Sequence, residues 1–365
     1  MLGISIYPYK EKLEETLAYL ELAHKYGFKR VFTNLLALEK GTEKQVLSEM
    51  KKTVQHARKL GMEVVLDINP GVFDQLAISY KDLSPFKELG ATGIRLDSSF
   101  DGMIESLMTF DPANLDLEVN ISYDTNYLDN ILSNQPNRKK IIGCHNFYPQ
   151  RFTGLDYDFF MKCSKKYKQL GLRTAAFINS HEANHGPHPY MDGLCTVEIH
   201  RDMPIVQQAK HLIATGLIDD IIIANAFASE KELQALNEVN QEVIQFHVVF
   251  SDGVSEIEKE VVLNHLHFNR GDINSYTCRS TYVKLEYMNA DITENNTKEI
   301  LNIGDITVGN NSFGQYKGEL NIVKQEMPNH GEKNVVAKII PEEHFLISYI
   351  KPWSKFVFRE EKEND

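Results

Sequence analysis

The chain has 365 residues, 42% of them hydrophobic and 25% charged, which is enough for two domains or for one large barrel with an appendage. Its formal net charge of −12 argues against a nucleic-acid groove, whose affinity depends on clustered cations, but it does not exclude a small anionic substrate. The four cysteines are widely spaced and form no C-x-x-C pair, which favours free thiols in a reducing compartment over a disulfide framework.

The amino-terminal residues Met1–Pro8 run directly into a strand-like segment. They contain no basic region followed by a long apolar run, so we expect no signal peptide. No apolar run elsewhere approaches the length of a membrane span. The sequence therefore predicts a cytoplasmic protein with neither a membrane nor a nucleic acid as partner.

Through residue 241 the chain alternates short strand-like runs with amphipathic helical stretches. The predicted helices include Glu11–Tyr26, Glu43–Leu60, Tyr157–Leu170 and Glu230–Val239. The eight predicted strands are Gly3–Tyr7, Arg30–Asn34, Glu63–Ile68, Gly93–Asp97, Leu115–Ser122, Lys140–His145, Arg173–Ile178 and Asp220–Ala224.

Two kinds of boundary signal support these elements. Capping-box patterns at Thr42…Gln45 and Ser229…Glu232 predict helix starts, because the hydroxyl and the third-residue side chain satisfy free backbone amides. Glycine recurs where helices should end, as left-handed backbone geometry favours (Gly27, Gly61, Gly90 and Gly171).

Strict alternation of strand and helix requires parallel strands joined by crossovers. Eight such units favour a closed (β/α)₈ barrel, the TIM barrel, over an open sheet. A dinucleotide-binding sheet would also need a glycine-rich turn after the first strand, where this chain has Tyr7-Pro8-Tyr9-Lys10. We therefore predict a catalytic α/β barrel over residues 1–241.

Residues 242–365 have a different character. Turn clusters separate short strand-like runs and no long amphipathic helix is apparent, which favours a small all-β domain, a β-barrel or a sandwich. The predicted strand-like runs are Val248–Phe250, Val261–Leu263, Tyr282–Leu285, Leu320–Val323, Val335–Ala337 and Phe345–Ile347.

Polar residues inside three consecutive barrel strands need a reason, because such strands are buried on both faces. Side chains alternate along a strand, so Asp67 and Asn69 point away from the face that carries Val64, Leu66 and Ile68. By the same rule, Arg95 and Asp97 share a face in the next strand, as do Glu118 and Asn120 in the one after. Asp67, Asp97 and Glu118 should therefore converge on the lumen.

Two carboxylates held close together split their pKa values, so that one serves as an acid and the other as a base or nucleophile. Glycoside hydrolysis needs such a pair, and TIM barrels place catalytic groups at the carboxyl ends of their strands. The alternative is an interior ion-pair network in which Arg95 balances Glu118 and both serve only structure.

The sixth strand leads into Cys144-His145-Asn146-Phe147-Tyr148-Pro149. Adjacent residues of a strand point to opposite faces, so Cys144 and His145 do not act as a nucleophile pair. We expect Cys144 to pack in the core, and His145 or Asn146 to line the mouth of the barrel. A core imidazole satisfied by its neighbours remains an equal alternative for His145.

The segment after the seventh strand contains a literal H-E-x-x-H, from His181 to His185. A zinc site needs both histidines on one helix face, and the Gly186-Pro187 that follows makes a helix doubtful. Loops after strands seven and eight of TIM barrels commonly bind phosphate, so we expect Glu198-Ile199-His200-Arg201 to serve an anionic substrate. No cofactor and no metal are expected.

Several of these segments together resemble the bacterial 6-phospho-N-acetylmuramidase family. The resemblance covers nearly the whole chain and is carried by Gly3–Tyr7, Leu66–Pro70, Ile94–Asp97, His145–Pro149 with Thr153–Leu155, Gly186-Pro187, Gly193-Leu194, Glu198–Arg201, Arg270–Asp272, Arg279-Ser280 and Tyr316–Leu320. It implies a TIM barrel followed by a cyclophilin-like β domain. The implied activity is hydrolysis of N-acetylmuramic acid 6-phosphate–N-acetylglucosamine, a phosphorylated amino-sugar disaccharide, during cell-wall recycling. The resemblance transfers no catalytic residues.

We therefore expect Asp67 and Asp97, or Glu118 in place of one of them, to flank the glycosidic bond, with the second domain acting as a lid. The rival readings are a metal-dependent sugar-phosphate isomerase or aldolase, and a non-catalytic sugar-phosphate-binding protein. A homo-oligomer is compatible with the sequence. Expected substrate contacts are Tyr7, Asn69, Arg95, Asn120, His145, Asn146, Tyr148, Arg151, Glu198, His200, Arg201, Arg270, Asp272 and Arg279.

Overall fold

The computed structural model describes residues 1–35, 43–76, 78–183 and 185–361. The chain forms two compact units, which we call unit 1 (Met1–Val239) and unit 2 (Asn240–Asp365). Each unit is described by itself. Among the described residues, no helix combines the length and apolar character that crossing a bilayer requires.

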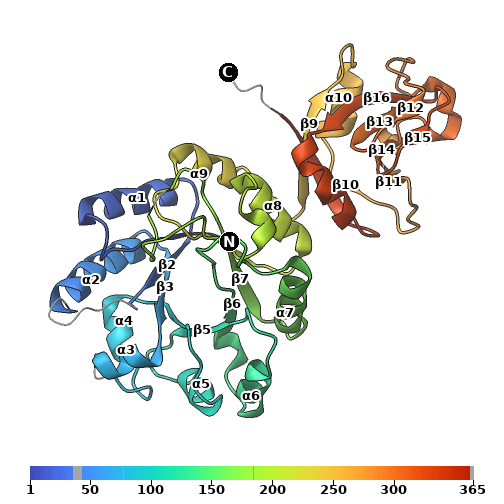
Figure 1. The fold of residues 1–365 in the computed structure, drawn as a ribbon. Coiled ribbons are helices and arrows are strands. Elements are labelled where there is room, and N and C mark those ends of the chain that lie inside the picture. The colour runs from blue at the N-terminus through green and yellow to red at the C-terminus, as the bar shows by residue number, and fades with distance from the viewer. Residues whose placement is uncertain (36–42, 77, 184, 362–365) are drawn as a thin grey trace. The chain divides into compact units, whose positions relative to one another are not determined.

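In unit 1, eight parallel strands close into a barrel in chain order, with β8 pairing back onto β1. Figure 1 shows the barrel strands with the helices around them. The predicted TIM-barrel fold is thereby confirmed. The strands are β1 (Leu2–Ser5), β2 (Arg30–Asn34), β3 (Glu63–Ile68), β4 (Gly93–Leu96), β5 (Asp116–Asn120), β6 (Ile141–Cys144), β7 (Arg173–Ile178) and β8 (Asp220–Ile223).

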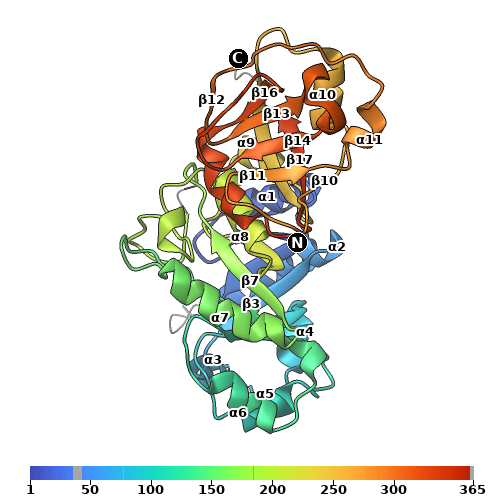
Figure 2. The same cartoon turned by 90° about the vertical axis from the view of Figure 1, so that its right-hand side faces the viewer.

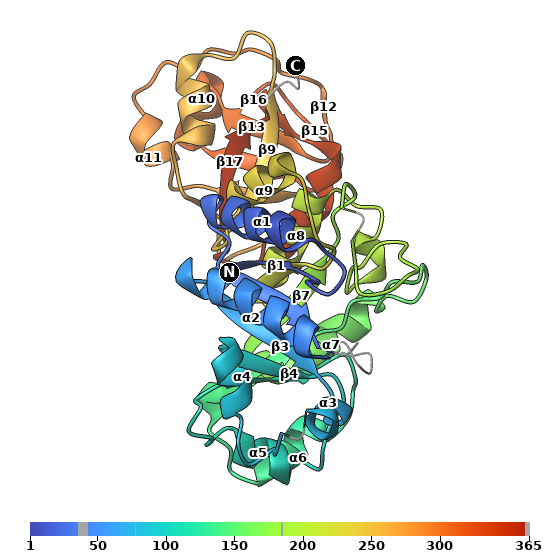
Figure 3. The same cartoon turned by 90° about the vertical axis from the view of Figure 1, so that its left-hand side faces the viewer.

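Helices cover the outside of the barrel, as the turned views show (Figure 2). The first two, α1 and α2, pack against each other on this outer surface (Figure 3). The helices are α1 (Leu13–Lys25), α2 (Glu43–Lys59), α3 (Pro70–Gln75), α4 (Ser84–Leu89), α5 (Met103–Met108), α6 (Tyr127–Ser133), α7 (Tyr157–Gln169), α8 (Ile205–Thr215) and α9 (Glu230–Asn237), with short 3₁₀ turns η1 (Arg138–Lys140) and η2 (Glu198–His200).

The boundary signals act as the sequence predicts. Ser229 caps α9: its Oγ accepts from the Glu232 amide at 3.2 Å, and Glu232 Oε2 accepts from the Ser229 amide at 3.1 Å. The four glycines expected at helix ends all have positive φ angles, between 73° and 107°. The other predicted cap, Thr42, lies outside the described residues.

The strands alternate between two environments. Val64, Leu66 and Ile68 of β3 pack outward into the core beneath the helices, while Val65 and Asp67 take the opposite, lumen-facing parity. The same alternation in the other strands fills the lumen in layers, as TIM barrels do. One layer is apolar and includes Phe32, Cys144 and Phe177, so the packing role expected for Cys144 is confirmed.

A buried ion network fills the lumen toward the amino ends of the strands. Arg30 of β2 donates to both Glu118 of β5 and Asp220 of β8, and all three side chains are at most 1% exposed. Arg173 extends the network, at 2.7 Å from Asp220 and 2.8 Å from Glu63. Glycine at position 3 leaves room for it, since a Cβ there would lie 3.1 Å from Arg30 Cβ.

Unit 2 contains a seven-stranded, mainly antiparallel sheet in the order β10-β17-β9-β16-β13-β14-β11, and a two-stranded sheet of β12 and β15. The outer strands approach each other, because the Arg270 amide donates to the Arg279 carbonyl at 3.1 Å. Its strands are β9 (Ile244–Phe250), β10 (His267–Phe268), β11 (Thr277–Ser280), β12 (Ile300–Leu301), β13 (Asp305–Gly309), β14 (Leu320–Val323), β15 (Met327–Pro328), β16 (Lys333–Ile339) and β17 (Lys355–Glu360).

Three of the six strand-like runs expected in this unit are strands, within β9, β14 and β16. The other three are wrong, because they lie in α10 (Glu256–Leu263), at α11 (Lys284–Tyr287) and in the 3₁₀ segment η4 (Pro341–Tyr349). For α10 the missed signal is a capping box: Ser255 Oγ accepts from the Glu258 amide at 3.3 Å, and the Ser255 amide donates to Glu258 at 2.9 Å.

We predict that Glu118→Gln lowers the free energy of unfolding of the barrel by about 3 kcal/mol, because it leaves the Arg30 guanidinium buried with only part of its compensating charge. Urea unfolding followed by far-ultraviolet circular dichroism measures the change.

The matched control is Glu230→Gln, which removes an exposed ion pair with Lys25 at 2.8 Å. Exposed pairs contribute little, so this variant should unfold like the wild type. Equal stability of the two variants would contradict a structural role for the buried network.

Candidate functional site

Arg95 of β4 joins three side chains at the carboxyl ends of β3, β4 and β6. Its Nη1 donates to Asp67 Oδ1, at the end of β3, at 2.6 Å, and to Asp97 Oδ1, just after β4, at 3.3 Å. Its Nη2 donates to Asn146 Oδ1, just after β6. The structure thus brings together four of the side chains that the sequence predicts at the mouth.

The two carboxylates differ in their surroundings. The side chain of Asp67 is 6% exposed, whereas that of Asp97 is 42% exposed. Burial raises the pKa of Asp67 to about 6, although the neighbouring Arg95 guanidinium lowers it. Asp67 is therefore a carboxyl group that can still carry a proton near neutral pH, beside a carboxylate open to solvent.

Further predicted residues surround this pair. Tyr7 is fully buried, and its hydroxyl donates to the Ala224 carbonyl at 2.6 Å. Asn69 caps α3 by accepting from the Val72 amide at 3.1 Å. Asn120 is 7% exposed, and its Nδ2 has no partner among the described residues. A buried amide donor without a partner is uncommon in folded proteins.

Two groups near the mouth were not expected from the sequence. Glu11, after β1, accepts from the Tyr7 amide and the Thr16 hydroxyl, both at 3.0 Å, and burial raises its pKa to about 7. His188 lies in the loop after β7, where burial and the charge of Lys10 lower its pKa while Asp97 raises it. The signal in the sequence is that both residues follow a barrel strand. The helix predicted to start at Glu11 begins at Leu13, which leaves Glu11 in the loop after β1.

A pocket of about 600 Å³ lies among the loops that follow β6, β7 and β8, where we expected an anion. Its side walls include His181, His188, Arg151 and Arg201. Lys10 ties the loop after β7 to the loop after β1, because its Nζ donates to the carbonyls of Gly186 at 3.2 Å and Pro187 at 2.6 Å.

The arginines of this pocket already have partners. Arg201 is 3% exposed, grips Glu198 with two bonds of 2.7 Å, and donates from Nη1 to the carbonyls of Tyr148 and Asp192. Arg151 pairs with Asp192 and Asp202, at 2.8 and 2.7 Å. The side chain of Asp202 is 77% exposed, so the ion pair between Arg151 and Asp202 is the weakest of the interactions that these two arginines make.

Glu198 has a local structural role. It accepts from Arg201, and from the amides of Phe152 at 2.8 Å and Gly154 at 2.7 Å, and these bonds lower its pKa to about 2. A carboxylate with this many donors fastens the loop after β6 to η2.

Two predicted histidines lie behind the barrel wall instead of at its mouth. His145 is fully buried, within hydrogen-bonding distance of Ser122 at 3.2 Å and of Ser164 on α7 at 2.8 Å. His200 is likewise fully buried, and its Nε2 lies 2.9 Å from His211 Nδ1 on α8. His145 therefore matches the alternative of a core imidazole. The predicted ligand role of His200 is not supported by this placement, because its buried ring is paired with α8 behind the barrel wall.

Glu118 also lies away from the mouth, because it forms its ion pair with Arg30 in the buried ion network and not with Arg95. The described part of the H-E-x-x-H segment is not helical: His185 forms an isolated bridge with Ala226, and Asn184 lies outside the described residues. Among the described residues, no group of three or more His, Cys, Asp or Glu side chains has a metal-binding arrangement.

The expected contacts from the second domain form their own pairs within unit 2. Arg270 makes two bonds to Asp272, at 2.6 and 2.7 Å. Arg279 makes two bonds to Glu319, at 2.8 and 3.0 Å. The lid role of this domain stays a prediction.

A closed parallel barrel with paired carboxylates at its carboxyl rim defines a TIM-barrel protein whose candidate site lies at the mouth. Comparison with known families then places the chain more narrowly. It belongs to the 6-phospho-N-acetylmuramidase family, whose N-terminal part matches residues 2–238 and whose C-terminal part matches residues 244–359.

Two solved structures are similar over nearly their whole length. An uncharacterized B. cereus protein has 49% sequence identity and a TM-score of 0.90, covering 98% of this chain and 99% of that one. A conserved protein of unknown function from Enterococcus faecalis has 24% identity and a TM-score of 0.70, covering 99% and 96%. A comparison with curated proteins finds no match.

We predict that Arg201→Lys loosens the loops around the pocket, because a lysine cannot reproduce the two-pronged bond to Glu198 together with the bonds to two carbonyls. Limited proteolysis should show faster cleavage within residues 146–202 than in the wild type. Arg151→Lys is the control, because its ion pairs with Asp192 and Asp202 are both accessible to solvent and should contribute little, so this variant should be cleaved like the wild type. Equal protection of both variants would contradict an anchoring role for Arg201.

Proposed function

We propose that this chain is a glycosidase that hydrolyses the bond between N-acetylmuramic acid 6-phosphate and N-acetylglucosamine. Membership of the family supports the substrate class, and the observation that carries the chemistry is the sharing of Arg95 Nη1 by Asp67 and Asp97. Placement in the cytoplasm and in peptidoglycan recycling belongs to the same proposal.

The spacing of the two acids favours one stereochemical class. Because both oxygens contact one nitrogen, at 2.6 and 3.3 Å, they can be no more than about 6 Å apart. Retaining glycosidases hold their carboxyl groups about 5–5.5 Å apart, whereas inverting enzymes need about 6.5–9.5 Å to admit a water molecule. The upper limit on the distance between these two oxygens lies below the inverting range, which favours retention of configuration.

In the proposed mechanism Asp67 is the general acid. Its proton passes to the glycosidic oxygen as the bond from that oxygen to the anomeric carbon breaks, leaving Asp67 ionised beside the Arg95 guanidinium. Asp97, the more exposed carboxylate, faces the anomeric carbon. It forms the glycosyl ester itself, or it orients the acetamido group, whose oxygen then attacks. Asp67 next takes a proton from the water that releases the sugar.

For the 6-phosphate we propose the pocket beside β7 and β8. Arg151 is its best cation, because phosphate can replace the exposed Asp202 carboxylate without unpairing a buried charge. Arg201 is unsuited to this role, since its guanidinium is engaged with Glu198 and two carbonyls.

We predict that Asp67→Asn and Asp97→Asn each lower kcat/KM by about 10²-fold or more, because each removes a group that acts in the transition state. Mass spectrometry of the released sugars, from the phosphorylated disaccharide, measures turnover. Asp116→Asn is the matched control, since Asp116 pairs with Lys140 at the opposite end of β5 and should leave turnover unchanged.

Retention of more than half of the wild-type turnover by both variants would remove the paired-acid mechanism. The unphosphorylated disaccharide tests the phosphate pocket in the same assay, and a preference for it would remove that part of the proposal.

The raised pKa of Asp67 gives the pH dependence a sign. An acid must start protonated, and Asp67 loses its proton as the pH rises through about 6. We predict that kcat/KM falls with rising pH through this region, and that residual activity of Asp67→Asn lacks this limb. A profile that rises through pH 6 would assign Asp67 as a base instead.

A further inference from the structure

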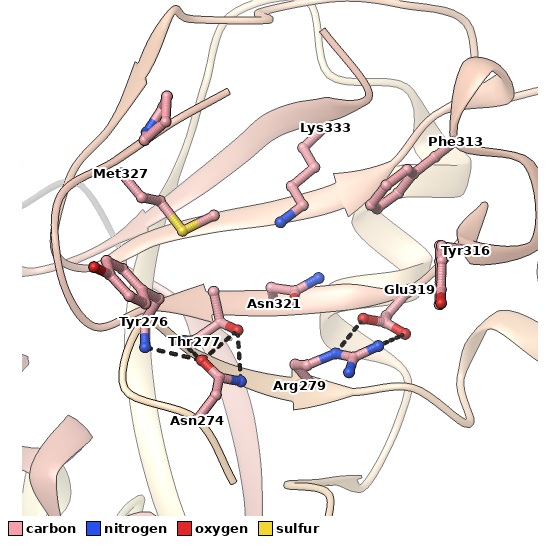
Figure 4. A pocket seen from close by; sticks show the side chains of 11 residues that line it. Asn274, Tyr276, Thr277, Arg279, Phe313, Tyr316, Glu319, Asn321, Met327 and Lys333 are labelled. Carbon is pink, nitrogen blue, oxygen red and sulfur yellow. Dashed lines mark hydrogen bonds and ion pairs between the residues drawn. The ribbon is translucent and has the colours of Figure 1, made fainter. Parts of the chain in front are cut away.

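Unit 2 contains a pocket of its own, with a volume of about 480 Å³, the size of a small-molecule site (Figure 4). Every residue that lines it belongs to unit 2, so its chemistry can be read without reference to the barrel. The strands β11, β14 and β16 provide the floor, and the 3₁₀ segment η3 (Asn311–Tyr316) provides one wall.

The floor is polar where a sheet face is ordinarily apolar. Arg279 of β11 lies opposite Asn321 of β14, and Asn321 lies opposite Thr307 of β13. Asn321 is 2% exposed, yet its Nδ2 has no partner among the described residues, and the same is true of Thr307 Oγ1. Buried polar groups are nearly always paired, so a donor left free beneath a cavity is available to a ligand.

The charged side chains that line the pocket favour an anionic ligand. Arg279 is held by Glu319 with two bonds, which leaves Lys333 as the uncompensated cation of the lining. In the described part of the chain, Lys333 Nζ makes neither an ion pair nor a hydrogen bond. It lies over the Phe313 ring, 5.7 Å from the ring centroid. Arg279 and Lys333 against Glu319 give the pocket one positive charge within a chain of formal charge −12.

The aromatic side chains in the pocket walls favour a ligand that contains a ring. Phe313 and Tyr316 stand together on η3, with ring centroids 5.3 Å apart. Gly309 allows this segment to fold close over β13, because a Cβ there would lie 2.5 Å from the Tyr316 carbonyl and 2.8 Å from the Phe313 ring. A pyranose has an apolar C–H face for aromatic rings and hydroxyl groups for amides and carboxylates, which matches this combination.

We propose that this pocket binds an anionic sugar, with the acidic group at Lys333 and Asn321 and the ring against Phe313 and Tyr316. The anionic part of this assignment rests on the pocket alone, whereas the choice of a sugar rests on the proposed function. A carboxylate and a phosphate offer the same acceptor oxygens, so N-acetylmuramic acid and N-acetylglucosamine 6-phosphate are the two probes, and N-acetylglucosamine is the neutral comparison.

The experiment titrates the full chain with each probe by isothermal calorimetry, since none of the three monosaccharides has a glycosidic bond to hydrolyse. At least one anionic probe should bind at least tenfold more tightly than the neutral sugar, and the stronger of the two identifies the acidic group. Hydrogen–deuterium exchange with that probe should show protection within residues 277–280 and 311–323.

Lys333→Met and Asn321→Leu should each weaken binding of the anionic probe at least tenfold and abolish this protection. Lys338→Met, which removes an exposed lysine from the same strand β16, should change neither. Phe313→Ala is a further variant that alters only a partly exposed wall and should also weaken binding.

Equal binding of neutral and anionic sugars would overturn the proposal, and so would unchanged protection in Lys333→Met and Asn321→Leu. This outcome is distinguishable from failure of the proposed function. Lys333-dependent binding without hydrolysis by the wild type would leave the pocket and remove the glycosidase, whereas hydrolysis without such binding would do the reverse.

Discussion

The candidate site depends on one guanidinium. Arg95 holds a buried and an exposed carboxylate within bonding distance of a single nitrogen, and it fixes Asn146 from a third strand with its other arm. Without that cation, two acids at this spacing would repel each other, and Asp67 would be buried without compensation. The same contact sets their unequal environments, which is what allows two chemically identical side chains to take different roles.

The sequence predicts whether a strand residue faces the lumen or the surrounding helices. It does not predict how far along the barrel axis that residue lies. Alternation along β3 and β4 correctly brought Asp67, Arg95 and Asp97 together. The same rule placed Glu118 in the lumen, yet it is paired with Arg30 toward the amino ends of the strands. Period two also separates Cys144 from His145 without saying which faces inward, and packing of Cys144 beside Phe177 decides this.

Unit 2 shows a different limit of sequence interpretation. Val261-Val262-Leu263 has strand-like composition, but the cap at Ser255 starts a helix, and Val261 and Val262 lie on its buried side. Short apolar runs fit either element, so only the packing decides. The pocket could not be anticipated either, since Arg279, Asn321 and Lys333 come together only through the pairing of strands distant in the chain.

The ion network of Arg30, Glu118 and Asp220 limits the routes by which a ligand could enter or leave the barrel. These buried charged side chains close the lumen at the amino ends of the strands, so a ligand can enter the barrel only at the carboxyl ends. Whatever occupies the rim must arrive and depart on the same side. A reaction there would have to release both halves of a split molecule past one opening, so the loops around that opening would govern the order of their departure.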